Sequence, residues 1–204
     1  RGLGAFAVTN HNQIMLARVT RSIARRLGGP TVLVGEEITG KGFHLIGVGL
    51  TKRVDWNQSP VGAIRAIHAQ NGVAIAAHPV ARYWPSFDAS ALALLDGTEV
   101  LHPIAIDSPT HRSELRSFYE RAKADGHRVS AVGSSDYHWR SAPNVCRTFV
   151  FVRDESAAAI LDALREARTV VYDDLGEPLG DPQLAAELAQ VPLPTTPDDS
   201  FAAA

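Results

Sequence analysis

Apolar and polar residues follow one another in blocks that predict strands and helices in turn. The first apolar run, residues 5–9, is short and suits a buried strand. A helix follows, with apolar positions three and four residues apart that form one stripe. The stripe consists of Leu16, Val19, Ile23 and Leu27. Residues 28–30, Gly-Gly-Pro, end this helix.

The same helix carries Arg18, Arg21 and Arg25 on another face. Basic residues at this spacing favour a solvated helix face over a phosphate-binding patch.

Alternation continues along the rest of the chain. Further strands are expected at residues 31–39, 43–50, 73–77, 98–101, 129–132, 147–152 and 169–172. Further helices are expected at residues 60–72, 89–95, 108–126 and 155–167, with one more possible at 183–189. The pair at 31–39 and 43–50 reads as a hairpin, because Gly40-Lys41-Gly42 joins them. Strands alternating with helices predict an α/β fold with a mainly parallel sheet.

Proline becomes frequent after residue 176. We therefore expect a main domain at residues 1–175 and a C-terminal extension at residues 176–204. The last dozen residues are expected to form a disordered tail.

Composition narrows the classes of protein that this chain can be. Of its 204 residues, 45% are hydrophobic and 21% charged, as in soluble globular proteins. The formal net charge of −2 gives no electrostatic case for nucleic acid as the main partner, although it does not exclude one. The single cysteine, Cys146, rules out an internal disulfide and favours a reducing compartment, so we expect the cytoplasm. A membrane partner is not expected, because no apolar run approaches about 18 residues.

The chain opens on Arg1 and runs straight into its first apolar block, with no signal peptide. We expect that an upstream segment is missing.

Imidazoles and carboxylates stand at the ends of four predicted strands. His11 follows the first strand, His78 ends another, and Asp136 and His138 follow a third. The fourth strand ends with Glu36 and Glu37, of which only one can face the site, and spacing alone does not choose between them. The carboxyl ends of parallel strands meet on one face. Zinc, manganese and iron accept these ligands, so the set predicts a metal site.

The other histidines are interpreted differently. His68 lies in mid-helix and is expected to be structural or at the surface. His111 and His127 are expected to be exposed. His102, at another strand end, is expected to contact substrate or act as a general acid, or else to lie on the rim of the site.

Five short motifs occur in an order that resembles the PHP (polymerase and histidinol phosphatase) superfamily. They are Thr-Asn-His-Asn at 9–12, Gly-Glu-Glu-Ile-Thr at 35–39, Phe-His-Leu-Ile-Gly at 43–47, Ala-His-Pro at 77–79 and Gly-Ser-Ser-Asp-Tyr-His at 133–138. The resemblance extends to about Asp173. It implies a distorted (β/α)7 barrel that holds two or three divalent ions of zinc, manganese or iron. It also implies hydrolysis of phosphate esters of small molecules.

The resemblance assigns six metal ligands by motif: His11, Glu37, His44, His78, Asp136 and His138. Glu37 would bridge two ions, His44 and His78 would bind the second, and Asp136 and His138 would bind different ions. Arg82 matches an arginine that some members place near the substrate phosphate, and it reads equally well as a surface residue.

This chain departs from the family pattern in two respects. The family opens with a His-x-His strand followed by a further ligand, and no residue before Asn10 is His or Asp. The first strand and helix of the barrel are therefore expected to be lacking. Asn10 also replaces an Asp that usually supports the ligands, which removes negative charge from the site.

The function implied is that of a metal-dependent phosphoesterase. A metal-activated water would attack, with no further catalytic residue. Two alternatives remain: a carbamate or carboxylic ester hydrolase, which an apolar pocket near Trp84 and Phe87 would favour, or a degenerate, non-catalytic PHP domain.

Overall fold

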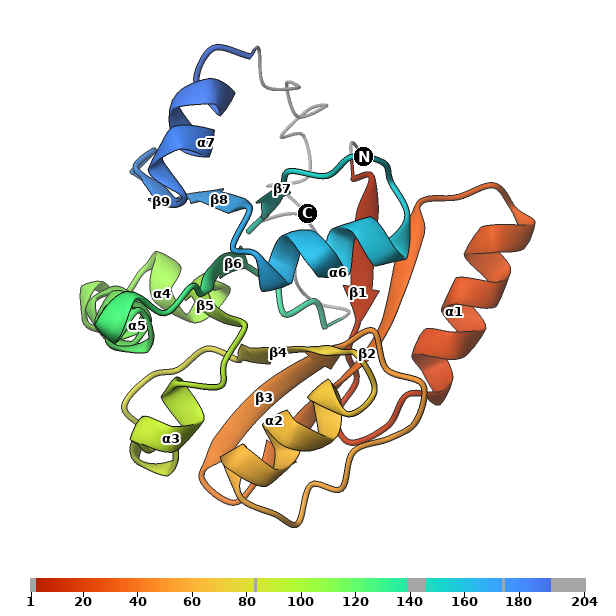
Figure 1. Cartoon of the computed structure of the whole chain (residues 1–204), viewed down its shortest axis with the longest axis horizontal. Helices are drawn as coiled ribbons and strands as arrows, with labels where there is room; N and C mark the ends of the chain where they lie inside the picture. Colours follow the sequence, from red (N-terminus) through yellow and green to blue (C-terminus); the bar gives the residue numbers. More distant parts are fainter. Residues whose placement is uncertain (1–2, 83, 139–145, 174, 192–204) are drawn as a thin grey trace.

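The structure is a computed structural model that describes residues 3–82, 84–138, 146–173 and 175–191. Two sheets form its framework (Figure 1). The larger sheet contains six strands in chain order: β1 (Ala5–Val8), β2 (Thr31–Gly40), β3 (Phe43–Val48), β4 (Val73–Ala76), β5 (Gly97–Leu101) and β6 (Ser130–Gly133). The smaller sheet contains β7 (Phe149–Val150), β8 (Thr169–Tyr172) and β9 (Pro178–Gly180).

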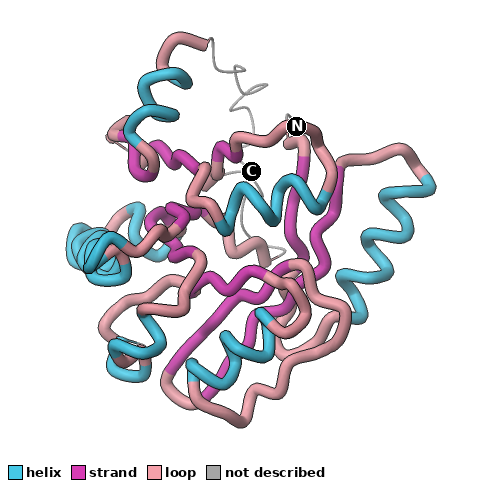
Figure 2. Tube along the Cα trace, in the orientation of Figure 1, coloured by secondary structure: helices cyan, strands magenta, loops and turns pink. Residues whose placement is uncertain are grey.

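Helices connect most of these strands (Figure 2). The α-helices are α1 (Met15–Arg26), α2 (Pro60–His68), α3 (Ala89–Leu92), α4 (Pro103–Ile106), α5 (Pro109–Ala122), α6 (Ala157–Arg165) and α7 (Pro182–Leu188). Short 3₁₀ turns lie at Trp84–Ser86 and Ala124–Gly126. The expected strands and helices are present, while α4 and β9 were not expected.

The larger sheet is mixed and curls into a half-barrel. Strand β1 runs parallel to β2, and β4, β5 and β6 are parallel to one another. Strand β3 is antiparallel to β2, as the expected hairpin requires. It is also antiparallel to β4, which was not expected of a mainly parallel sheet. The fold class is therefore mixed α/β, and the (β/α)7 arrangement stays a prediction.

Local sequence explains where several elements begin. Pro60 stands at the first position of α2, where a missing amide hydrogen costs nothing. The Ser59 side chain accepts a hydrogen bond from the Gly62 amide and caps the same helix. Gly42 has φ of 76°, the left-handed conformation that the tight turn between β2 and β3 needs.

The sheet has an apolar core on each side. Helices α2 and α6 both contact β4, and Figure 1 shows them on opposite sides of that strand. The larger core includes Phe43, Ile64 and Phe118, and the smaller includes Val73 and Ile160. These two layers hold the strands rigidly, so the side chains at the strand ends have fixed positions.

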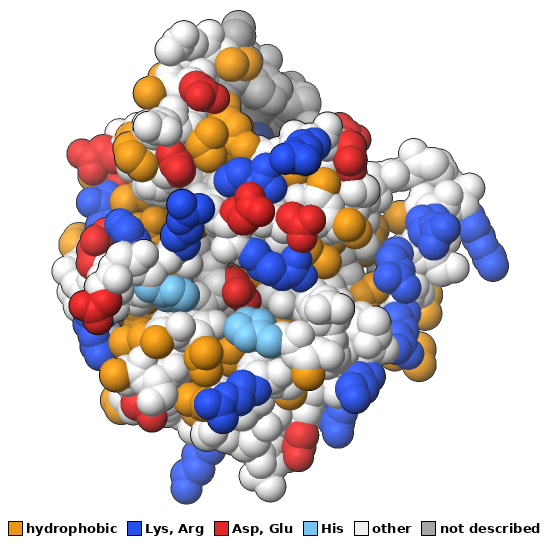
Figure 3. All heavy atoms as spheres, in the orientation of Figure 1, with side chains coloured by type: hydrophobic (Ala, Val, Ile, Leu, Met, Phe, Trp, Pro, Cys, Tyr) orange, Lys and Arg blue, Asp and Glu red, His pale blue; other side chains and the backbone are white. Residues whose placement is uncertain are grey.

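The apolar stripe on α1 does not face the core. Leu16, Val19, Ile23 and Leu27 are between 46% and 79% exposed, whereas the small residue Ala17 is buried against β1 and β2. The periodicity thus predicted the helix correctly, and the structure adds that its apolar stripe is not the buried face. Arg18, Arg21 and Arg25 are exposed, as expected, and Figure 3 shows basic side chains gathered over this helix.

The segment after residue 176 takes part in the fold. Strand β9 is hydrogen-bonded to β8, and α7 packs against both strands. The expected disordered tail lies outside the described residues. Cys146 is buried and not in a disulfide. Among the described helices, none has the length and apolar character that crossing a membrane requires.

Candidate metal centre

The register of the β2–β3 hairpin selects the glutamate that faces the site. His44 is paired with Thr39, and side chains directly opposite in an antiparallel pair point to the same face. Glu37 lies two residues before Thr39 and therefore shares that face, while Glu36 points to the other. Glu36 is buried there, where its Oε1 accepts the Val54 amide at 2.5 Å.

Glu37, His44 and His78 bring three ligand atoms together. His44 Nδ1 lies 2.6 Å from Glu37 Oε1 and 3.0 Å from His78 Nε2. His78 Nε2 lies 3.7 Å from the same Oε1. Ligands 2.0–2.1 Å from a tetrahedral ion are separated by about 3.4 Å. The two His78 separations lie near this value, whereas His44 Nδ1 and Glu37 Oε1 are closer and would have to move apart around an ion. The donor set fits for a second reason: Oε1 is buried, and no described residue donates it a hydrogen bond of good geometry.

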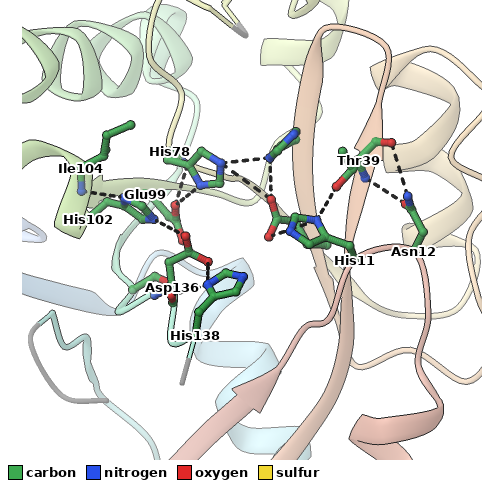
Figure 4. Close-up of polar contacts among 12 residues, drawn as sticks. His11, Asn12, Thr39, His78, Glu99, His102, Ile104, Asp136 and His138 are labelled. Atoms are coloured by element: carbon green, nitrogen blue, oxygen red, sulfur yellow. Dashed lines mark hydrogen bonds and ion pairs between the residues drawn. The ribbon is translucent and has the colours of Figure 1, made fainter. Parts of the chain in front are cut away.

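His11 reaches the same carboxylate from β1. It pairs with Glu37 through an isolated parallel bridge, and its Nδ1 lies 3.8 Å from Glu37 Oε2. Nδ1 also lies 2.5 Å from the Thr39 hydroxyl, as Figure 4 shows. That contact leaves Nε2 available to a ligand. The His11 and His44 ring centroids are 5.8 Å apart.

Asp136 and His138 enter from the loop after β6. The two side chains approach at 3.6 Å between Oδ1 and Nδ1, and the His138 ring centroid is 6.3 Å from that of His11. His138 Nδ1 lies 2.9 Å from the Asp136 carbonyl oxygen. The structure thus brings all six sequence-predicted ligand residues together. Figure 4 shows four of them with labels: His11, His78, Asp136 and His138.

Glu99, on β5, belongs to this cluster and was missed by sequence reasoning. It is fully buried, and its Oε2 lies 2.5 Å from the His78 amide and 3.4 Å from His78 Nδ1. A carboxylate on this side of the ring leaves Nε2 to face Glu37 and His44. The sequence signal was a charged residue inside an otherwise apolar strand, which is costly unless the charge is paired.

Backbone strain coincides with this cluster. His78 has φ of 28° immediately before Pro79, and Asp136 has φ of 41°. Such conformations are unfavourable for residues with a Cβ and persist where surrounding contacts enforce them.

The electrostatics couple these groups. Burial lowers the pKa of His78, but the hydrogen bond to Glu99 and the charges of Glu99, Glu37 and Asp136 raise it, and the result is a raised pKa. Burial raises the pKa of Glu99, yet His78 and His102 lower it overall. The His102 ring is the largest cause of the lowered pKa of Asp136. Both carboxylates therefore stay ionised, as ligands and their partners must.

Other sequence-predicted residues lie elsewhere. Arg82 is exposed after β4 and does not line the cavity described below, so its role near a phosphate stays a prediction. Phe87 packs in the core against Phe43 and Phe118, which removes it as a pocket residue. The Trp84 side chain lies outside what the structure describes.

The remaining four histidines lie outside the predicted ligand set and differ in burial and contacts. His68 contacts Asp96 at 2.8 Å and is structural, as expected. His111 and His127 are half-buried rather than exposed, because each ring contacts a backbone carbonyl, those of Ile104 and Leu95. His102 is 4% exposed, so it is not a rim residue.

A cavity of about 650 Å³ opens beside the cluster. Its lining includes the polar residues His11, Glu37 and Asp136 and the apolar residues Phe6 and Leu16. Among the described residues that line it, none is Lys or Arg. Its size suits a small organic ligand.

Comparisons with known proteins agree with this fold. No family model matches the chain. An uncharacterized protein of Methanocaldococcus jannaschii is 31% identical over 103 residues, which are 50% of this chain and 60% of that protein. A solved two-domain protein from Bacteroides vulgatus, described as containing a predicted PHP-like metal-dependent phosphoesterase, superposes with a TM-score of 0.61 at 19% identity. The match covers 85% of this chain and 57% of that protein, so the chain spans little more than half the length of either relative. The half-barrel is thus a fold shared with a PHP-like protein.

Proposed function

We propose that this chain carries the site of a metal-dependent hydrolase that acts on phosphate esters of small molecules. The observation that carries the proposal is the convergence of Glu37 Oε1, His44 Nδ1 and His78 Nε2, with His11, Asp136 and His138 around them. The similarity to a PHP-like fold supports the same reaction class.

Each ligand residue has a defined part in this proposal. Glu37 presents Oε1 to His44 and His78 and Oε2 to His11, which supports the proposal that it would bridge two ions. The His138 ring lies near that of His11, and Asp136 lies beside His138, so these three residues would form the second group. Divalent ions bound here would supply Lewis acidity and lower the pKa of a water. Zinc, manganese and iron all suit this nitrogen and oxygen donor set.

The proposal includes a His-x-His segment that completes the ligand set. Such a strand has a place to bind, because β1 is hydrogen-bonded on one side to β2 and ends the larger sheet among the described residues.

A second candidate is hydrolysis of an uncharged carboxylic or carbamate ester. The absence of Lys and Arg from the described cavity lining favours it, as do the apolar lining residues Phe6 and Leu16. In this cavity, bound metal ions alone would compensate the negative charge of a doubly charged phosphate.

Metal analysis of the purified protein, followed by assays on aryl phosphates and aryl carboxylates, distinguishes these candidates. Bound metal with phosphatase activity supports the first candidate, and bound metal with esterase activity alone supports the second. A protein that contains the His-x-His segment and has neither bound metal nor hydrolase activity is a degenerate, non-catalytic domain. Asp136→Asn and His78→Ala should lower metal content and cut hydrolysis by orders of magnitude. His68→Ala is the control, because its ring contacts Asp96 outside the site.

A further inference from the structure

His102 ends β5 and caps α4 with its own ring. Its Nδ1 accepts a hydrogen bond from the Ile104 amide at 3.1 Å (Figure 4). A neutral imidazole has one nitrogen that donates and one that accepts. Because Nδ1 accepts, the proton of His102 resides on Nε2.

The Nε2–H group of His102 is buried and has no hydrogen-bond partner among the described residues. The side chain is only 6% exposed. Its closest carboxylate oxygen is Asp136 Oδ2, 3.5 Å from Nε2, and Figure 4 shows the ring directed toward this residue. A buried donor without a partner is costly, so a small closure toward Oδ2 would be favourable.

The same ring also lies in a group that resembles a metal site. Ligand atoms of His78, Glu99 and His102 fall within 4.8 Å of one another. Coordination through Nε2 would require the proton to move to Nδ1, where it would face the Ile104 amide hydrogen. Two donors would then oppose each other in a buried place, and the cap of α4 would be lost.

We propose that His102 is a positioning residue that anchors Oδ2 of Asp136 through its Nε2–H group, and that it does not bind metal. Oδ1 of Asp136 is then left facing His138, on the side where the ligands gather. The strained backbone of Asp136 makes such an anchor useful, because its conformation needs support from the surroundings. The consequence for metal binding rests on the proposed function, whereas the protonation of the ring does not.

Nitrogen-15 NMR of the metal-free protein tests the protonation directly. The His102 signals are assigned by their loss in His102→Gln. The expected spectrum has a protonated Nε2 and an unprotonated Nδ1. A ring protonated at Nδ1 overturns the proposal, whether or not the protein binds metal.

Two substitutions separate anchoring from capping. His102→Asn keeps an acceptor for the Ile104 amide, since Asn is a favourable N-cap residue, but it is too short to reach Asp136. His102→Gln keeps a donor near the position of Nε2 and loses the cap. We expect His102→Asn to weaken zinc binding about 10- to 100-fold and His102→Gln to weaken it far less. Zinc affinity that is unchanged in His102→Asn, or equally reduced in both, overturns the proposal.

Cadmium-113 substitution supplies the last readout. Scalar coupling between cadmium and imidazole nitrogen is expected for His44 and His78, and coupling to His102 overturns the proposal. His127→Gln is the matched control for the two His102 variants, because the His127 ring contacts the Leu95 carbonyl away from the site. If wild-type protein binds no metal, the proposed function fails, and the NMR experiment still decides the state of His102.

Discussion

Glu99 Oε2 lies 2.5 Å from the backbone nitrogen of His78 and 3.4 Å from Nδ1 of the same residue. One carboxylate thus secures both the main chain and the ring of a candidate ligand. The main chain needs this hydrogen bond, because His78 has a φ of 28° and is followed by a proline. The ring needs it because hydrogen bonding at Nδ1 determines which nitrogen faces the metal.

Substituting Glu99 with Gln should therefore weaken metal binding without removing a ligand. An outer carboxylate partner of a ligating histidine typically contributes 10- to 100-fold in metal affinity, and we expect a loss of about that size. Competition for zinc with a chromophoric chelator measures it. Glu120→Gln, on the exposed face of α5, is the control. Wild-type affinity in Glu99→Gln would show that His78 is oriented by other contacts.

Neighbouring glutamates provide a sharp test of the hairpin register. Glu37→Gln removes the charge that faces His44 and His78, and it should abolish or greatly reduce zinc binding. Glu36→Gln removes the same carboxylate charge one residue away, on the opposite face of the strand. This variant should retain wild-type zinc content. Metal analysis of both purified variants checks this. The reverse result would mean that the strand faces the site in the other register.

Glu36 should also make the stability of the metal-free protein depend on pH. Burial raises its pKa above the ordinary value of 4.5, and the Val54 amide and Arg53 offset this only in part. A raised folded-state pKa contributes stability below the unfolded-state pKa, and this contribution is lost as the pH rises through the folded-state pKa.

Glu36→Gln removes that titration and still accepts the Val54 amide. The variant should therefore gain stability relative to wild type between about pH 4 and pH 7. Guanidinium unfolding at both pH values measures the difference. A difference that does not change with pH would show that Glu36 keeps its ordinary pKa in the folded state.

The exposed stripe of α1 predicts a contrast between two isoleucines. Ile23 is 52% exposed, so Ile23→Ala should change the free energy of unfolding by less than about 0.5 kcal/mol. Ile64, on α2, is fully buried, and Ile64→Ala should cost about 2–5 kcal/mol. Chemical denaturation of both variants compares them. A large loss at Ile23 would mean that the stripe is covered in solution.

Sequence periodicity predicted the order of strands and helices because each is a local property. Pro60 and the glycines around Lys41 place the start of α2 and the hairpin turn without any tertiary information. Which face of α1 is buried was not predictable in this way. That choice depends on which side of the helix meets β1 and β2, and here the small Ala17 permits the close approach.

The candidate ligands that follow strands were predictable from the sequence. The residues that hold those ligands in position were not. His11, His78 and Asp136 stand at strand ends, and position alone drew attention to them. Glu99 lies inside a strand and His102 acts through a backbone amide, so neither has a distinctive spacing. Choosing Glu37 over Glu36 required either the family motif or the hairpin register.

The β2–β3 hairpin also bears on how the protein reaches its native state. Glu37 and His44 are separated by a single tight turn, and hairpins of this kind form in about 1–10 μs. His78 and Asp136 join them only after much longer loops close, which is slower. We therefore expect Glu37 and His44 to come together before the half-barrel is complete. Zinc present during refolding would bind this early pair first and bias the chain toward the native pairing of its strands.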